Sequence, residues 1–301
     1  MKRKVSKIGP ATLMVSLPAP WVKRYNINKG DEIDLEEKGN KIIVSAKKEK
    51  SIGKVNISSK ELGMFDRNFI SYLYQKGYDE IRVEFDDVKI FNIIQDKISK
   101  LMGFEIVNQT QNSCTIKSIS TVLETEFDSI LRRTFLILVE MANSSYEAFE
   151  ENNYQKLKEI SAMEITIDRL TDFLKRILNK NGYKEEEKLT FIYCIIRDLE
   201  KVGDIYRDIC NEYADKKTKI SKETLNLFKE TNNLFELFYR LFYKFDKKAV
   251  VMLHKEKNRL MKKANELFEK QQKQELKLIH NIMNLTTIVF DLYGPYFTMV
   301  V

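Results

Sequence analysis

The feature that most constrains the fold is a helical spacing of apolar residues, which begins near Ser120 and continues to the end of the chain. In its first segment, apolar side chains recur every three or four positions, at Phe127, Ile130, Leu131, Phe135, Leu138, Ala142, Tyr146 and Phe149. This spacing predicts an amphipathic helix of about thirty residues. Five further helices are predicted at 153–180, 186–214, 221–244, 246–270 and 273–293. Their short connections predict antiparallel neighbours, and hence two three-helix bundles in tandem, over 120–215 and 220–298.

A weak internal repeat supports this division into two bundles. Asp168-Arg169-Leu170 in the second predicted helix corresponds to Asn258-Arg259-Leu260 in the fifth. Ile195-Ile196-Arg197-Asp198 in the third corresponds to Leu278-Ile279-His280-Asn281 in the sixth. Matching segments at matching places in each bundle are what a duplicated helical unit would show.

Residues 51–119 alternate between strand and helix signals. Strands are predicted at Val55–Ile57, Glu80–Phe85, Phe104–Gln109 and Ser113–Ile119. One helix, capped by Ser58 or Ser59, is expected to end near Gly77, and another, capped by Asp86 or Asp87, to end at Gly103. The order β-α-β-α-β-β predicts a small open sheet with two helices on one side. No catalytic motif falls within this α/β domain, and we interpret it as a spacer or as a domain that binds no ligand.

Residues 1–50 predict four short strands and one helical turn. Two strands flank Gly9-Pro10, Pro20 can begin a helix over Ala19–Tyr25, and Gly30 suits a turn. Alternating apolar residues on both sides of Lys38-Gly39-Asn40-Lys41 predict a hairpin. A segment this small cannot bury enough apolar surface alone. We therefore expect an intertwined homodimer in which two copies share one small barrel.

The positive charge of the chain is concentrated in the same fifty residues. They hold twelve basic and six acidic side chains, an excess of +6, whereas the whole chain carries +7. The remainder is thus nearly neutral. A local excess of this kind favours a polyanionic partner through the release of counterions. Lysines that only keep the protein in solution remain the alternative.

Several classes of protein are disfavoured by what the sequence lacks. The cysteines Cys114, Cys194 and Cys210 show no C-x-x-C spacing, so disulfides are not expected and a cytoplasmic location fits. The apolar run Ile282–Val301 is interrupted by polar residues, so no membrane insertion is expected. With two histidines, no nucleophile motif and no phosphate-binding glycine loop, the chain is not expected to be an enzyme.

Two acidic stripes remain as candidates for chemistry. Glu164, Asp168 and Asp172 lie on one face of the second predicted helix, and Glu200, Asp204 and Asp208 on one face of the third. Two such stripes on adjacent helices could hold an oxygen-coordinated cation such as Mg²⁺, or an iron or zinc cluster. The alternative is ion pairing of Asp172 with Arg176, Arg197 with Glu200, and Asp204 with Arg207. The corresponding positions of the second bundle are not carboxylate-rich, so at most one metal site is expected: His254, Asn258, Lys262, Met283, Thr287 and Asp291.

Two motif sets resemble known families. The segments Ser6-Lys7-Ile8-Gly9, Val15-Ser16-Leu17-Pro18, Trp21-Val22 and Lys29-Gly30-Asp31-Glu32-Ile33 resemble the AbrB/SpoVT-type swapped-hairpin DNA-binding domain, over residues 1–50. Leu199-Glu200-Lys201-Val202-Gly203-Asp204 resembles a signature of PhoU, whose fold is two three-helix bundles, over about residues 120–298. Together they resemble the archaeal PhoU-like phosphate uptake regulators. The domains would then be 1–50, a small α/β domain at 51–119, and a PhoU-like helical domain at 120–301.

The resemblance implies a dimeric transcriptional regulator of phosphate uptake that binds double-stranded DNA, with a helical domain that senses or relays phosphate status. DNA contacts, mainly to phosphates, are expected from Arg3, Lys4, Lys7, Lys23 and Arg24. The resemblance also implies a divalent or iron-type metal ion in the first bundle, with ligands Glu164, Asp168, Glu200 and Asp204. The alternative is an adaptor that binds a phosphate transporter or sensor protein, in which the N-terminal domain only dimerises.

Overall fold

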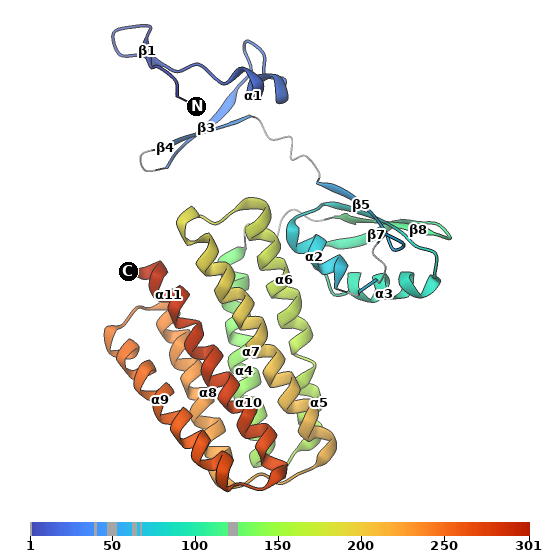
Figure 1. The fold of residues 1–301 in the computed structure, drawn as a ribbon, viewed down its shortest axis with the longest axis vertical. Helices are drawn as coiled ribbons and strands as arrows, with labels where there is room; N and C mark the ends of the chain where they lie inside the picture. The colour runs from blue at the N-terminus through green and yellow to red at the C-terminus, as the bar shows by residue number, and fades with distance from the viewer. Residues whose placement is uncertain (1, 39–40, 47–52, 62–64, 67, 120–125) are drawn as a thin grey trace. The chain divides into compact units, whose positions relative to one another are not determined.

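A computed structural model of the chain describes residues 2–38, 41–46, 53–61, 65–66, 68–119 and 126–301. The chain forms two compact units, Met1–Ile52 and Gly53–Val301, which we call the first and second units (Figure 1). The expected boundaries after residues 50 and 119 fall at segments outside the described residues. No described helix is both long enough and apolar enough to cross a bilayer.

The first unit consists of two small hairpins and a helical turn. Strands β1 (Ser6–Lys7) and β2 (Leu13–Met14) pair antiparallel, and α1 (Ala19–Arg24) follows, with Pro20 in its first turn. Strands β3 (Ile33–Lys38) and β4 (Lys41–Ala46) form the second hairpin, with Leu35 opposite Val44. These elements confirm the predicted order. Gly30 has φ +99°, as its turn requires, while the expected turn residues Gly39 and Asn40 lie outside the described part.

No described side chain of the first unit is buried. Leu13 is 69%, Leu35 66% and Ile42 70% exposed, although all three lie in strands. Strand residues of this kind normally face a core, so the single chain contains the elements of a small β domain without its interior.

The second unit begins with a four-stranded sheet. Its elements are β5 (Lys54–Ser58), α2 (Phe69–Lys76), β6 (Glu80–Glu84), α3 (Val88–Ile98), β7 (Phe104–Gln109) and β8 (Ser113–Ser118), which confirms the predicted β-α-β-α-β-β order. The strand order is β5-β6-β8-β7, with β5 and β6 parallel and the other pairs antiparallel. Both helices lie on one side of the sheet (Figure 1).

The helix limits in this region were predicted less well than the strands. Asp87 caps α3 as expected, because its side chain accepts a hydrogen bond from the Lys89 amide at 2.8 Å. The helix ends at Ile98, however, well before Gly103. Neither Ser58 nor Ser59 caps α2: Ser58 is the last residue of β5, and the Ser59 amide extends the ladder by donating to the Glu84 carbonyl at 2.9 Å.

The rest of the second unit is helical. Its main helices are α4 (Phe127–Glu150), α5 (Tyr154–Ser161), α6 (Glu164–Asn181), α7 (Leu189–Lys216), α8 (Lys222–Tyr243), α9 (Lys247–Lys270), α10 (Lys273–Asp291) and α11 (Tyr293–Val300). The single helix expected over 153–180 is wrong, because it is divided into α5 and α6. Around Met163 the backbone hydrogen bonds tighten to a three-residue spacing, from Met163 to Ile160 and from Thr166 to Met163.

The helices share one apolar core. Helices α4, α6 and α7 contact one another, as do α8, α9 and α10, and α4 and α7 also contact helices of the second group. The Phe135 ring lies 6.2 Å from that of Phe235 and 5.0 Å from that of Phe242. Buried Asn232 links the two groups through polar contacts: it accepts from the Tyr206 hydroxyl and donates to the Ala142 carbonyl. The two groups therefore pack as one body.

Candidate functional site

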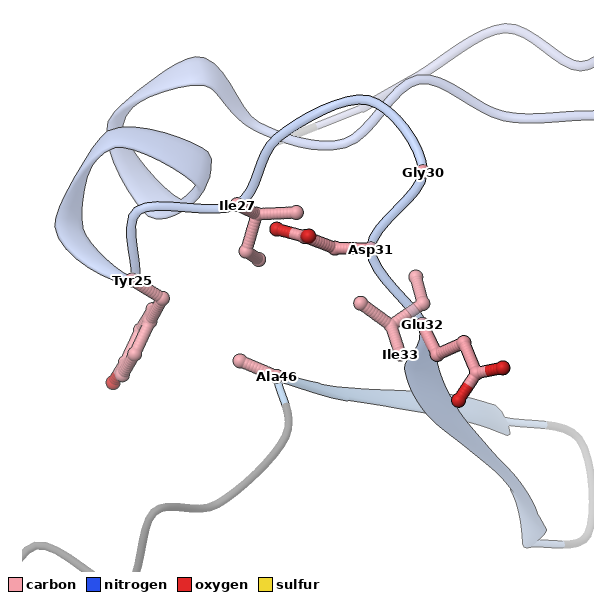
Figure 2. Close-up of a pocket in the computed structure, with 7 residues that line it drawn as sticks. All are labelled: Tyr25, Ile27, Gly30, Asp31, Glu32, Ile33 and Ala46. Carbon is pink, nitrogen blue, oxygen red and sulfur yellow. The ribbon is translucent and has the colours of Figure 1, made fainter.

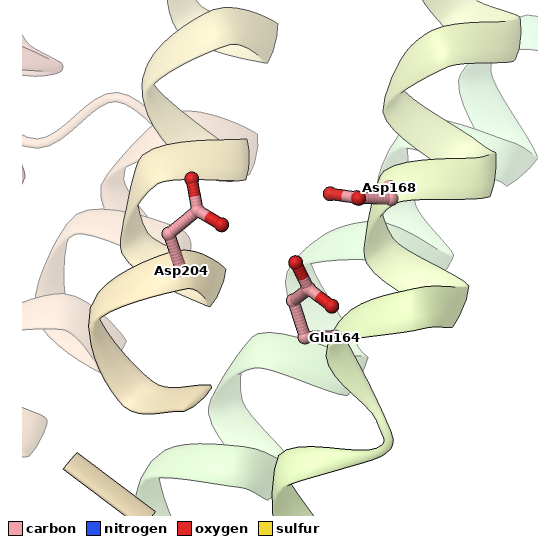
Figure 3. Close-up of side chains that lie close together, drawn as sticks. All are labelled: Glu164, Asp168 and Asp204. Atoms are coloured by element: carbon pink, nitrogen blue, oxygen red, sulfur yellow. The ribbon is translucent and has the colours of Figure 1, made fainter. Parts of the chain in front are cut away.

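Three of the four predicted metal ligands meet between α6 and α7. Glu164 and Asp168 come from successive turns of α6, and Asp204 faces them from α7 (Figure 3). One carboxylate oxygen of each residue lies within 4.8 Å of the other two. The i, i+4 spacing of Glu164 and Asp168 is what places both on the same face of α6.

A glycine allows α6 and α7 to approach closely beside this carboxylate cluster. A Cβ atom at Gly203 would lie 3.3 Å from two side-chain carbons of Ile167, which is tighter than most such contacts. Ile167 and Gly203 immediately precede Asp168 and Asp204 in the sequence. The glycine of the predicted signature therefore has a packing role that brings the carboxylates of the two helices together.

The carboxylate cluster has unfavourable electrostatics. Burial raises the pKa of Asp168 to about 7, and repulsion from Glu164, Glu200, Asp172 and Asp204 adds to this effect. Burial also raises the pKa of Glu164, although Arg207 acts in the opposite direction. The helices thus hold acidic groups together at a cost in stability, as binding sites for cations do.

Arg207 is the cation that faces this cluster. Its guanidinium group donates hydrogen bonds to Glu164 and Asp204 and also to Asp208, at 3.1 and 2.9 Å. The predicted Asp204–Arg207 ion pair is therefore present. Asp168 receives no ion pair in the part of the chain that the structure describes, and it is the carboxylate with the strongly raised pKa.

The fourth predicted ligand, Glu200, is directed elsewhere. It forms an ion pair with Lys175 and accepts a hydrogen bond from the Thr171 hydroxyl at 3.4 Å. The expected pairing of Glu200 with Arg197 is wrong, because Arg197 binds the neighbouring Asp198 at 2.9 Å. Glu200 still lies close enough to Asp168 to raise its pKa.

Asp172, the third member of the α6 stripe, contacts the α/β region. Its carboxylate accepts a hydrogen bond from the Gln75 side chain of α2 at 2.7 Å, and Lys175 lies 4.0 Å away. This contact was not predicted from the sequence, because Gln75 and Asp172 are 97 positions apart. A chain of polar contacts thus runs from α2 through Asp172 and Lys175 to Glu200, beside the carboxylate cluster.

Arg176 fixes the end of α2 to α6. Its guanidinium group is buried and donates to the carbonyls of Tyr74 and Tyr78, at 2.9 and 2.6 Å, and to Asp79. Lys180 also pairs with Asp79, at 2.8 Å. The expected pair of Arg176 with Asp172 is therefore wrong. A cation bound to the last carbonyls of a helix is favourably placed in the field of that helix, so this contact holds the α/β region against α6.

The donor set of the cluster suits a hard cation. The three groups offer carboxylate oxygens, whereas thiolates and imidazoles, which zinc prefers, are not among them. Three protein oxygens leave several coordination positions for water or an anionic oxygen. A bound cation would replace the Arg207 guanidinium as the partner of Glu164 and Asp204.

The predicted DNA-binding residues lie in and just before β1 and at the end of α1, and all are exposed. Arg3 and Lys4 precede β1, Lys7 lies in β1, and Lys23 and Arg24 form the last turn of α1. The same unit has a hollow of about 510 Å³ between the turn after α1 and the β3–β4 hairpin. Figure 2 shows the apolar residues Ile27, Ile33 and Ala46 around this hollow, together with the acidic residues Asp31 and Glu32.

Two family models match the chain, one in each of the regions described above. Residues 7–52 match the model for antidote-toxin recognition MazE, bacterial antitoxin, and residues 131–213 match the PhoU domain. The crystal structure of the phosphate transport system regulatory protein PhoU from Streptococcus pneumoniae has 12% identity and a TM-score of 0.47, over 58% of this chain and 93% of that chain. No curated protein matched the chain.

The chain therefore carries an N-terminal MazE/AbrB-type antitoxin domain and a C-terminal PhoU domain. Domains of both types are typically regulatory. The PhoU match covers α4 to α7 and includes every predicted metal ligand, whereas the antitoxin match includes Lys7, Lys23 and Arg24 but begins after Arg3 and Lys4.

Asp168→Asn tests the cost of burying this carboxylate. Its folded pKa of about 7 lies above the ordinary value of 3.8, so the folded chain binds this proton more tightly than the unfolded chain does. The penalty is fully present above about pH 7 and disappears as the pH falls towards about 4. We expect the substitution to raise the free energy of unfolding by more than about 1 kcal/mol at about pH 8 and to change little at about pH 4.

Denaturant titrations at both pH values, with a chelator present, measure this difference. Asp215→Asn is the matched control, because Asp215 is an exposed carboxylate farther along α7. A destabilised Asp168→Asn variant at the higher pH would contradict the assigned electrostatics.

Proposed function

We propose that the chain is a dimeric DNA-binding transcriptional regulator of phosphate uptake, in which the helical domain senses or relays phosphate status. The observation that carries this proposal is a basic first unit without an interior, joined to a PhoU domain. We assign residues 1–50 to DNA binding and dimerisation, 51–119 to a connecting α/β domain, and 120–301 to the PhoU-like domain.

The exposed apolar side chains of the first unit support dimerisation. Leu13, Leu35 and Ile42 are each more than 60% exposed, and no described neighbour buries them. Complete burial of such a side chain stabilises a fold by about 1.5–3 kcal/mol. A second copy offers the same strands, so a swapped dimer would bury these apolar side chains in a common core.

DNA binding is supported by charge and exposure. Arg3, Lys4, Lys7, Lys23 and Arg24 are exposed, and none forms an ion pair within the described residues. In a dimer the five basic residues occur twice, related by a two-fold axis. This arrangement suits phosphates on a duplex, whose own backbone has two-fold symmetry.

The helical domain is proposed to act on the first unit through the α/β domain. Asp172 connects the carboxylate face of α6 to Gln75, and Arg176 attaches the end of α2 to the same helix. A change of charge at Glu164, Asp168 and Asp204 would therefore alter the electrostatic potential at Asp172, whose hydrogen bond with Gln75 helps to position the α/β domain. The first unit directly precedes the α/β domain in the sequence.

A divalent or iron-type cation is proposed at the carboxylate cluster. Glu164, Asp168 and Asp204 supply its ligands. Glu200, which is paired with Lys175, adds negative charge near the cation without binding it. Open positions on such a cation would accept oxygens of phosphate, which gives the PhoU domain a means of responding to phosphate.

The alternative is an adaptor that binds a phosphate transporter or sensor protein, with the first unit serving only for dimerisation. The PhoU match favours it, because that match concerns the helical region alone. A dimeric full-length chain with no measurable affinity for duplex DNA at any salt concentration would favour the adaptor over the regulator.

The double substitution Arg3→Ala and Lys7→Ala tests the DNA interface. We expect duplex affinity to fall at least about tenfold at low salt, and the slope of log affinity against log salt to decrease by about 2. Gel-shift titrations over a range of salt concentrations, with a duplex from upstream of the gene for this chain, measure both quantities. The control is Lys89→Ala with Lys219→Ala, which removes the same charge from exposed positions of the second unit. Unchanged binding by the first variant would refute the assignment.

Elemental analysis of the purified chain tests the metal site. We expect about one metal ion per chain, lost in Asp168→Asn with Asp204→Asn and retained in Asp215→Asn. Gln75→Ala should retain the metal but reduce the effect of metal on duplex affinity, because it breaks the contact with Asp172. If the wild-type protein contains no stoichiometric metal, the metal site is refuted, and Arg207 is the cation that neutralises the cluster.

A further inference from the structure

A second concentration of positive charge lies on α9, far along the chain from the first unit. Residues 244–263 contain eight basic and two acidic side chains, an excess of +6 within twenty residues. This equals the excess found over the whole of residues 1–50. Acidic residues elsewhere in the second unit offset this excess, so the net charge of the second unit does not reveal it.

Only some of the basic residues on α9 and in the connection before it are neutralised by local ion pairs. Arg259 and Lys263 pair with Glu230, and Lys257 lies over the Phe290 ring at 5.2 Å. In contrast, five lysines are exposed and form no ion pair within the described residues: Lys244, Lys247, Lys248, Lys255 and Lys262. Such a row of free ammonium groups produces a positive field that favours an anionic surface.

Exposed apolar side chains accompany these lysines. Val251 is 53% and Met252 54% exposed, one turn from Lys248 and Lys255, and Phe245 is 41% exposed in the connection before α9. Helix α9 packs its inner side, with Leu253 and Leu260 buried, against α8 and α10. It lies at the edge of the helical region (Figure 1). The outer side therefore combines apolar and basic residues on one accessible surface.

We propose that residues 244–262, which comprise the connection before α9 and the exposed face of most of that helix, dock on an anionic membrane surface. A cluster of four to eight basic residues on an amphipathic helix is what anionic headgroups attract. The apolar side chains can enter the boundary between headgroups and acyl chains, while the lysines contact the phosphates. The contact is peripheral and involves one face of a folded helix.

The apolar residues distinguish a membrane from nucleic acid as the occupant. Phosphate contacts along a duplex come from basic and polar groups, and a duplex backbone offers nothing to bury Val251 and Met252. This inference is independent of the proposed DNA-binding function, since it concerns other residues in the other unit. It adds a location at the membrane to a protein that carries a PhoU domain.

Vesicle co-sedimentation of the full-length chain tests the proposal. The probes are vesicles of phosphatidylcholine mixed with phosphatidylglycerol, and vesicles of phosphatidylcholine alone, at low ionic strength. We expect binding to the anionic vesicles, reduced about 100-fold by Lys248→Gln, Lys255→Gln and Lys262→Gln together. All three positions are exposed, so the thermal transition should be unchanged.

The matched control is Lys219→Gln, Lys222→Gln and Lys273→Gln, which removes the same charge from exposed positions at the opposite end of α8 and α9. Any binding by the first unit is common to all of these chains. Val251→Gln with Met252→Gln should weaken binding about tenfold, whereas Leu136→Gln with Val107→Gln, at similarly exposed positions, should not.

Three results would overturn the proposal. The first is wild-type protein that does not bind anionic vesicles, and the second is an equal loss in the control variants. The third is a loss of duplex affinity in the α9 lysine variant while its vesicle binding is unchanged, which would make α9 a nucleic-acid surface.

Discussion

One constraint governs the first unit: it has apolar strands, but none of its described side chains is buried. Leu13, Leu35 and Ile42 face solvent in the single chain, and the unit has no buried described residue against which they could pack. A segment of this size cannot recover the conformational entropy of folding without further burial. A second copy is the partner with matching strands, so we infer that dimerisation and folding of this unit are one event.

The second unit has a well-packed core, and its unusual feature is a group of carboxylates held close together. Gly203 lets α6 and α7 approach closely, and this proximity forces Glu164, Asp168 and Asp204 together. Arg207 offsets part of the repulsion but leaves Asp168 with a raised pKa. We propose that this loss of stability is retained because the cluster binds a cation. On the same helix, Asp172 connects α6 to the α/β region through its hydrogen bond with Gln75.

The sequence predicted those features of the structure that depend on local periodicity. It did not predict features that depend on contacts between residues far apart in the chain. The order of strands and helices along the chain, the Asp87 cap and the meeting of Glu164 with Asp168 follow from local spacing in the sequence. The division at Met163 could not be predicted, because no proline or glycine marks it and the hydrogen-bond register alone changes. Arg176 and Glu200 were assigned to the wrong partners, since Asp79 and Lys175 compete for them from other elements. The positive charge of α9 was not recognised from the sequence, because the net charge was calculated over all residues after position 50 together.

Sedimentation equilibrium of the full-length chain measures whether the first unit brings two copies together. We expect a species of twice the 35.6 kDa chain mass for the wild type, and dissociation in Leu35→Asp. Leu136→Asp, at a comparably exposed site on α4, should remain dimeric. A wild-type chain that sediments as a monomer, with its β3–β4 hairpin protected from hydrogen exchange, would contradict the claim, because the first unit would then fold without a second copy.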